Sequence, residues 1–203
     1  MKIYTTDMQE IELKTGDELL CSGRSRMSKA IIFYNKLMGV TGPAAEISHV
    51  AKYIDGMVFE ATTLNKWCNK KGYQRNRFQN WYDNYDGKIW VRQTEGCEID
   101  ETQYQINASN MLSTPYESGV PGLMELLLTF VAVKWTLLRE WAKEHLRTKN
   151  IHCSESNVLL SQQAGYVSLD IRANKTPPCE FWDGELYEKA FIKGRLKKAV
   201  RIK

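Results

Sequence analysis

The chain has 203 residues, of which 43% are hydrophobic and 26% are charged, and its net charge is +4. These proportions are typical of one globular domain, and they exclude a disordered chain, a collagen-like repeat and a small disulfide scaffold. The charge is too small to indicate a nucleic-acid or membrane partner by itself. We therefore expect a single domain over residues 1–203.

Cysteine usage and the start of the chain bear on the compartment. The five cysteines are odd in number and none shows C-x-x-C spacing, which argues against a zinc ribbon and a complete disulfide framework. The first seven residues contain no apolar segment typical of a secretory signal. The apolar run over residues 123–133 is too short to span a membrane. A reducing, cytoplasmic location is therefore expected.

The first half of the chain is predicted to consist mainly of strands. A strand is expected over residues 18–21, followed by a helix over about 25–38 with Ser25 as its N-cap. Residues 48–54 and 57–62 are predicted to form a hairpin that is closed by a type I′ Asp55-Gly56 turn. Residues 65–86 break this pattern with many aromatic and basic side chains and are interpreted as an insertion. A further strand is expected over 87–94.

The second half is predicted to be mainly helical. Helices are expected over about 101–112 and 121–148, and a third helix is expected to begin near Cys153 and to end before Gly165. One or two basic strands are expected within 185–203. Because strands and helices are grouped rather than alternating, the pattern favours an α+β fold.

The hairpin places two functional side chains on one face. A two-residue turn pairs residue 51 with 60 and residue 49 with 62, so His49 and Glu60 are diagonal neighbours about 7–8 Å apart by Cα. A carboxylate there can accept the imidazole N–H and stabilise the protonated ring. The alternative is a surface His–Glu pair without function. The opposite face is apolar apart from Lys52.

Cys153 lies where the third predicted helix begins. A helix N-terminus stabilises a thiolate through its dipole and free N–H groups, and the same groups can hold an oxyanion. The alternative is a buried, inert cysteine. Together with His49 and Glu60, Cys153 completes the parts of a Cys–His–carboxylate nucleophilic site.

Several short motifs occur in an order that is typical of a known family. They are Gly16-Asp17-Glu18-Leu19-Leu20, Ser48-His49-Val50, Phe59-Glu60-Ala61-Thr62, Tyr116 after Pro115, Cys153-Ser154-Glu155 and Thr176-Pro177-Pro178. Through them residues 15–183 resemble the permuted papain-like amidases of the YaeF/YiiX type, within the NlpC-like superfamily. The histidine precedes the cysteine, as the permutation requires. The resemblance implies a circularly permuted papain-like fold, in which an antiparallel sheet or barrel packs against helices.

The resemblance also implies roles for single residues. Cys153 would be the nucleophile, His49 the general base and then acid, and Glu60 the residue that orients His49. Tyr116 would contact the substrate, although Ser113 and Thr114 replace the glycine context of the family. The implied activity is that of a thiol hydrolase, which cleaves an amide or ester bond in a peptide, a peptidoglycan stem or a lipid-linked acyl substrate. No metal or cofactor is implied, and His145 and His152 lack the paired spacing of metal ligands.

Other interpretations stay open. Lipid acyltransferases share the permuted fold, so an acceptor other than water is an alternative, and a catalytically silent papain-like binding module is another. Basic residues between 66 and 77 interleave with Trp67, Tyr73, Phe78 and Trp81 as in a single-strand stacking platform, although a solvated face is more common and no nucleic-acid partner is expected. The basic tail over 193–203 either contacts an anionic surface weakly or forms an edge strand with gatekeeper charges.

Overall fold

The fold is known from a computed structural model. It describes residues 1–62, 71–96, 100–115, 152–171, 173, 176–183, 189, 191 and 194–203. The helix predicted over 121–148 lies outside these residues, as does Tyr116. Within the described residues, no helix is long and apolar enough to cross a membrane.

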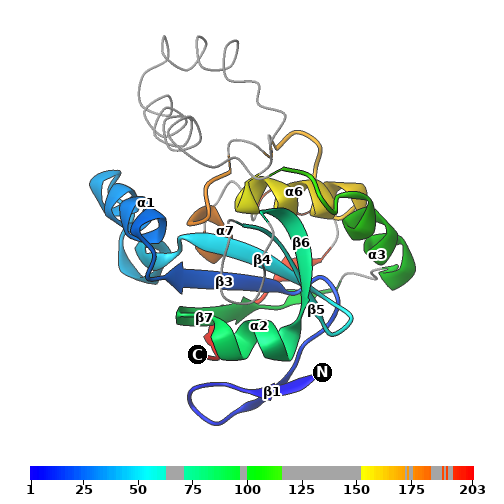
Figure 1. The fold of residues 1–203 in the computed structure, drawn as a ribbon, viewed down its shortest axis with the longest axis horizontal. Coiled ribbons are helices and arrows are strands. Elements are labelled where there is room, and N and C mark those ends of the chain that lie inside the picture. Colours follow the sequence, from blue (N-terminus) through cyan, green and yellow to red (C-terminus); the bar gives the residue numbers. More distant parts are fainter. Residues whose placement is uncertain are drawn as a thin grey trace.

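An antiparallel sheet of six strands forms the centre of the fold (Figure 1). Its order is β10-β7-β3-β4-β5-β6. The strands are β3 (Glu18–Gly23), β4 (His49–Ile54), β5 (Met57–Thr62), β6 (Gly72–Arg77), β7 (Gly87–Arg92) and β10 (Val200–Arg201). Two small antiparallel pairs lie outside this sheet: β1 (Lys2–Tyr4) with β2 (Glu10–Glu12), and β8 (Thr94–Glu95) with β9 (Arg195–Leu196).

Helices cover both faces of the sheet (Figure 1). They are α1 (Arg26–Leu37), the 3-10 helix η1 (Gly42–Glu46), α2 (Phe78–Asn84), α3 (Glu101–Asn110), α6 (Cys153–Gln163) and α7 (Glu180–Asp183). Because side chains alternate along a strand, the sheet supplies two cores. Val50 and Phe59 pack in one core with Val158 of α6, whereas Ala51 packs in the other with Trp81 of α2. This mixed architecture confirms the α+β prediction.

The local predictions of the first half agree with the structure. The Ser25 side chain accepts a hydrogen bond from the Ser28 N–H at the start of α1. Asp55 and Gly56 both have positive φ, 43° and 74°, as a type I′ turn requires. The turn pairs residue 54 with 57 and residue 53 with 58, which is the predicted register.

The stretch interpreted as an insertion contains regular secondary structure in its described part. Its described part, residues 71–86, is not irregular, because it contains β6 at the edge of the central sheet and α2 beneath it. The aromatic residues at 78, 81, 82 and 85 follow the i, i+3, i+4, i+7 spacing of an amphipathic helix. Tyr73, Phe78 and Trp81 are at most 3% exposed. The stacking-platform interpretation is therefore wrong for these three rings, since they lie in the core.

Candidate active site

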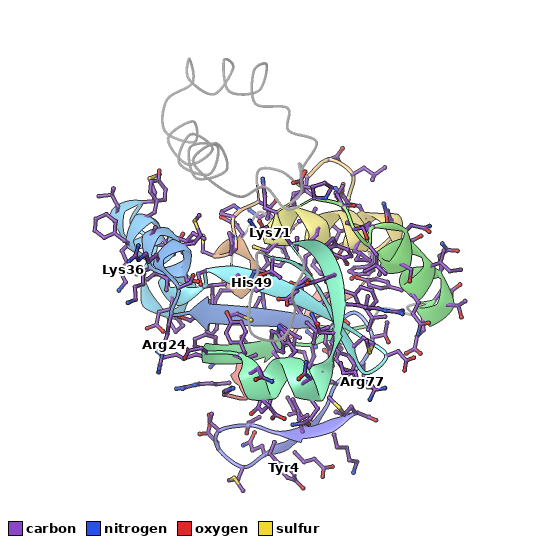
Figure 2. The ribbon with its side chains drawn as sticks, in the orientation of Figure 1. Tyr4, Arg24, Lys36, His49, Lys71 and Arg77 are labelled. Carbon is purple, nitrogen blue, oxygen red and sulfur yellow. The ribbon has the colours of Figure 1, made fainter. Side chains whose placement is uncertain are left out.

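His49 and Glu60 form a direct contact on the face of the hairpin that the register predicted. Nε2 of His49, the first residue of β4, donates a hydrogen bond of 2.7 Å to Oε2 of Glu60 on β5. The Glu60 side chain is fully buried and that of His49 is 13% exposed. Figure 2 shows His49 on its strand within the sheet. Because Glu60 occupies Nε2, the imidazole has Nδ1 left for a second partner.

Cys153 is the first residue of α6, and polar contacts hold this end of the helix against β4. Asn157 Nδ2 donates to the Val50 carbonyl at 3.1 Å and to the Cys153 carbonyl at 2.8 Å. The Ser156 hydroxyl donates to the same Cys153 carbonyl at 2.8 Å. These hydrogen bonds therefore hold the start of α6 beside Val50, the residue that follows His49. Asn157 was not predicted as a site residue, although a polar side chain one turn after a helix-opening cysteine is the signal that identifies it.

The Cys153 thiol and the His49 ring lie close enough for each group to shift the pKa of the other. Burial by itself raises the pKa of the thiol, but the charge and hydrogen bond of His49 outweigh it, with help from the backbone N–H groups of Val50 and Ser154, and the net pKa is lowered. Burial lowers the pKa of His49, yet the Cys153 thiolate and the Glu60 carboxylate raise it from 6.5 to about 10. Both directions favour a thiolate–imidazolium pair.

Two groups without charge line the site behind Glu60. Cys21 lies opposite His49 in the β3–β4 register, its thiol donates to the Leu19 carbonyl at 3.6 Å, and the Tyr85 hydroxyl is a neighbouring group. Burial, followed by the nearby charges that include Glu60, raises the pKa of both groups well above their ordinary values. They therefore stay protonated at neutral pH and add no charge of their own beside His49. Neither residue was identified from the sequence, because its contacts are long-range.

A buried ion pair lies farther along the same strand. Lys52 Nζ donates to Glu18 Oε1 at 2.7 Å, to the Ser161 hydroxyl of α6 at 3.3 Å and to the Tyr166 hydroxyl at 3.4 Å. Burial lowers the pKa of Lys52, but the charge and hydrogen bond of Glu18, together with the nearby Tyr104 and Asp17, outweigh burial, and the net pKa is raised. The ammonium group thus joins β3, β4 and α6 at a second point, about two turns from Cys153.

The remaining predicted residues have separate positions. His152 is the N-cap of α6, and its Nδ1 lies 3.7 Å from Glu155 Oε2. Tyr116 and His145 lie outside the described residues. Within the part of the chain that the structure describes, no group of three or more His, Cys, Asp or Glu side chains is placed to hold a metal ion.

The basic tail matches its edge-strand interpretation over the described residues. β10 pairs with β7 at one edge of the sheet. Arg195 and Lys197 lie 2.6 and 3.5 Å from Glu95, and Lys203 Nζ donates to the Tyr82 carbonyl. Three of the tail's cations therefore make contacts within the protein.

Comparison with known proteins yields little sequence similarity. No family model matches the chain, and no curated protein matches it. Among solved structures, it is similar to the metalloprotein yiiX from Escherichia coli O157:H7, described as DUF1105. The two chains share 16% identity with a TM-score of 0.49, over 93% of this chain and 90% of the other. The chemical inference for this protein therefore comes from its own side chains.

Proposed function

We propose that the protein is a cysteine hydrolase that cleaves an amide or ester bond through an acyl-enzyme on Cys153, within a circularly permuted papain-like fold. One observation carries the proposal: Cys153 and His49 lie close enough to shift each other's pKa, and Nε2 of the same His49 is hydrogen-bonded to the buried carboxylate of Glu60. This is the arrangement of an activated nucleophile, a base and the group that orients the base.

The first half of the proposed reaction forms the acyl-enzyme. The proton of Cys153 moves to His49, and the thiolate attacks the substrate carbonyl to form a carbon–sulfur bond. The backbone N–H of Cys153 at the start of α6 would stabilise the negative charge that develops on the carbonyl oxygen. The protonated His49 then donates its proton to the leaving amine or alcohol as the bond to that group breaks.

The second half releases the acyl group. His49 takes a proton from water, the resulting hydroxide attacks the thioester carbonyl, and the carbon–sulfur bond breaks to give an acid and the free thiol. Glu60 keeps the ring in place and stabilises its protonated form in both halves. Replacement of water by another acceptor would make the same site an acyltransferase. Peptide, peptidoglycan-stem and lipid-linked acyl groups are the substrate classes under this proposal.

The lowered pKa of Cys153 favours an enzyme over the silent-module alternative. A binding module has no need of an ionised thiol, and burial alone would raise the pKa of Cys153. The contacts with His49 instead keep the sulfur reactive. Strongly perturbed groups that share one small site are typical of catalytic centres.

Acylation by a chromogenic ester tests the proposal. With p-nitrophenyl acetate we expect a burst of nitrophenol and one added acetyl group, which peptide mass spectrometry should locate on Cys153. Cys153→Ala and His49→Ala should each abolish the burst. Cys179→Ala removes another buried thiol and should leave the burst intact. A wild-type protein that acquires no acetyl group on Cys153 would refute the proposal.

A further inference from the structure

The helix α1 has one face against the protein and one face toward solvent. Ile31, Tyr34 and Asn35 are its buried residues. Asn35 Nδ2 donates to the carbonyls of Ala45 and Ile47, at 3.3 and 3.0 Å. These bonds hold α1 on the chain that leads into β4, and they fix which side of the helix points outward.

The outward side of α1 carries large apolar side chains. Phe33 and Leu37 are 68% and 67% exposed, and a spacing of four residues makes them neighbours on the helix surface. Most large apolar residues of this chain that the structure describes are buried or half-buried. Two adjacent exposed ones on a helix mark a candidate contact surface.

Cationic side chains surround this apolar pair. Lys29 precedes Phe33 by four residues and Lys36 follows it by three, so both lie beside the ring on the same side of the helix. Both lysines are exposed, as is Arg26 at the start of the helix. The sequence of α1 contains no Asp or Glu. The outward face therefore combines apolar and positive groups without an acidic group of its own helix.

The composition of this face points to an anionic lipid bilayer, and we propose that α1 docks on such a surface. Phenyl and leucyl side chains insert at the boundary between headgroups and acyl chains, while lysine stems extend so that their ammonium groups reach lipid phosphates. Each cation near an anionic leaflet adds to binding. A protein partner would need an apolar groove with acidic residues at its rim. An anionic bilayer has negative headgroups directly above an apolar interior over its whole surface.

The position of α1 gives this docking a consequence for the site. The helix connects β3, which carries Cys21, to η1 and then to β4, which begins at His49. It lies at one end of the sheet, where Figure 2 labels Lys36 and Arg24, whereas Arg77 lies at the opposite end. Docking through α1 would therefore hold the end of the sheet that carries His49 near the membrane. The proposal does not require Cys153 to be catalytic.

Vesicle flotation tests the docking surface directly. We expect the protein to float with vesicles of phosphatidylcholine and phosphatidylserine. It should bind much less to vesicles of pure phosphatidylcholine, and much less to the mixed vesicles at high salt. Phe33→Ser with Leu37→Ser should reduce the partition coefficient about ten-fold or more, because the apolar insertion is lost. Both positions are exposed, so the thermal unfolding midpoint should not change.

A matched pair of charge reversals separates a local surface from the overall charge. Lys29→Glu with Lys36→Glu should lower the partition coefficient about ten-fold. The control, Arg75→Glu with Arg77→Glu, changes the net charge by the same amount at two exposed positions of the edge strand β6. It should lower the partition coefficient much less. Cys153→Ala should bind as the wild type does, so a failure of the proposed chemistry is distinguishable from a failure of docking.

Four results would overturn the proposal. The first is a wild-type protein that does not float with the anionic vesicles, and the second is an equal loss from the two charge reversals. The third is a dimer by light scattering that the double substitution of Phe33 and Leu37 converts to a monomer without any effect on vesicles, because a second copy would then cover α1. The fourth is a Phe33→Cys thiol that resists labelling in the absence of lipid, because another part of this chain would then cover the face.

Discussion

Replacement of His49 by alanine should remove the reactivity of Cys153 toward iodoacetamide at acidic pH. In the wild type, burial raises the pKa of the thiol, but the contributions of His49, together with the backbone N–H groups of Val50 and Ser154, outweigh burial and lower the pKa. The variant loses the contributions of His49 and keeps the burial. The pKa of Cys153 must therefore rise, and the fraction of thiolate at a given acidic pH must fall.

The size of the effect follows from the ionised fraction. An ordinary thiol with a pKa of ~8.5 is only ~0.3% thiolate at pH 6. A thiol kept in the ionised form gains up to ~300-fold in that fraction, and the weaker nucleophilicity of low-pKa thiolates cancels part of the gain. We therefore expect the labelling rate of Cys153 at pH 6 to fall by about ten-fold or more in His49→Ala.

The assay measures labelling rates for each cysteine peptide by mass spectrometry over a range of pH. Cys21 and Cys179 serve as internal controls, since both are buried free thiols, and burial raises the pKa of Cys21 well above its ordinary value. Circular dichroism would show that the variant is folded. The same pH profile for Cys153 in both proteins would refute the thiolate–imidazolium pair, and the proposed function would fail with it.

Three further predictions concern the support of the site and the fold. Glu60→Gln removes the carboxylate that raises the pKa of His49, so labelling of Cys153 at acidic pH should fall, though less than in His49→Ala; an unchanged profile would contradict the orienting role. Lys52→Met leaves Glu18 buried without its ammonium partner at 2.7 Å and should lower the free energy of unfolding by about 3–5 kcal/mol. Urea denaturation measures this change, and a loss below about 1 kcal/mol would show that the ion pair is not needed for stability. Gly87→Ala would place a Cβ 2.0 Å from the Ser22 carbonyl oxygen of β3 and should lower the thermal unfolding midpoint. The loss should be far larger than in Gly165→Ala, whose Cβ would meet nothing within 4 Å. Similar midpoints for the two variants would argue against the close approach of β7 to β3.

Local chemistry made several elements predictable from the sequence. The Asp55-Gly56 turn sets the register of its own hairpin, because a two-residue loop leaves only one way to pair the flanking strands. That register alone brings Glu60 to the same face as His49. Ser25 and Cys153 were identified as helix starts for the same kind of reason, since capping depends on residues within one turn.

The edge of the sheet shows where local rules stop. β6 has no clear alternation, because its first three residues are all buried, and its pairing with β5 decides its structure. α2 has helical spacing, but it is a short helix amid basic and amide residues. In the sequence, its aromatic side chains resemble a binding surface. In the structure, they pack against the sheet.

The meeting of Cys153 with His49 was decided only by tertiary structure. The two residues lie far apart in the chain, and their contact depends on how α6 packs across β4. Asn157 to Val50 and Lys52 to Ser161 set that packing, and no periodicity or turn rule joins those residues. The sequence by itself therefore determined the His49–Glu60 pair on the hairpin and the helix that begins at the thiol. The position of the thiol beside the imidazole depends on long-range polar contacts, because these form only when the strands and the helix pack together.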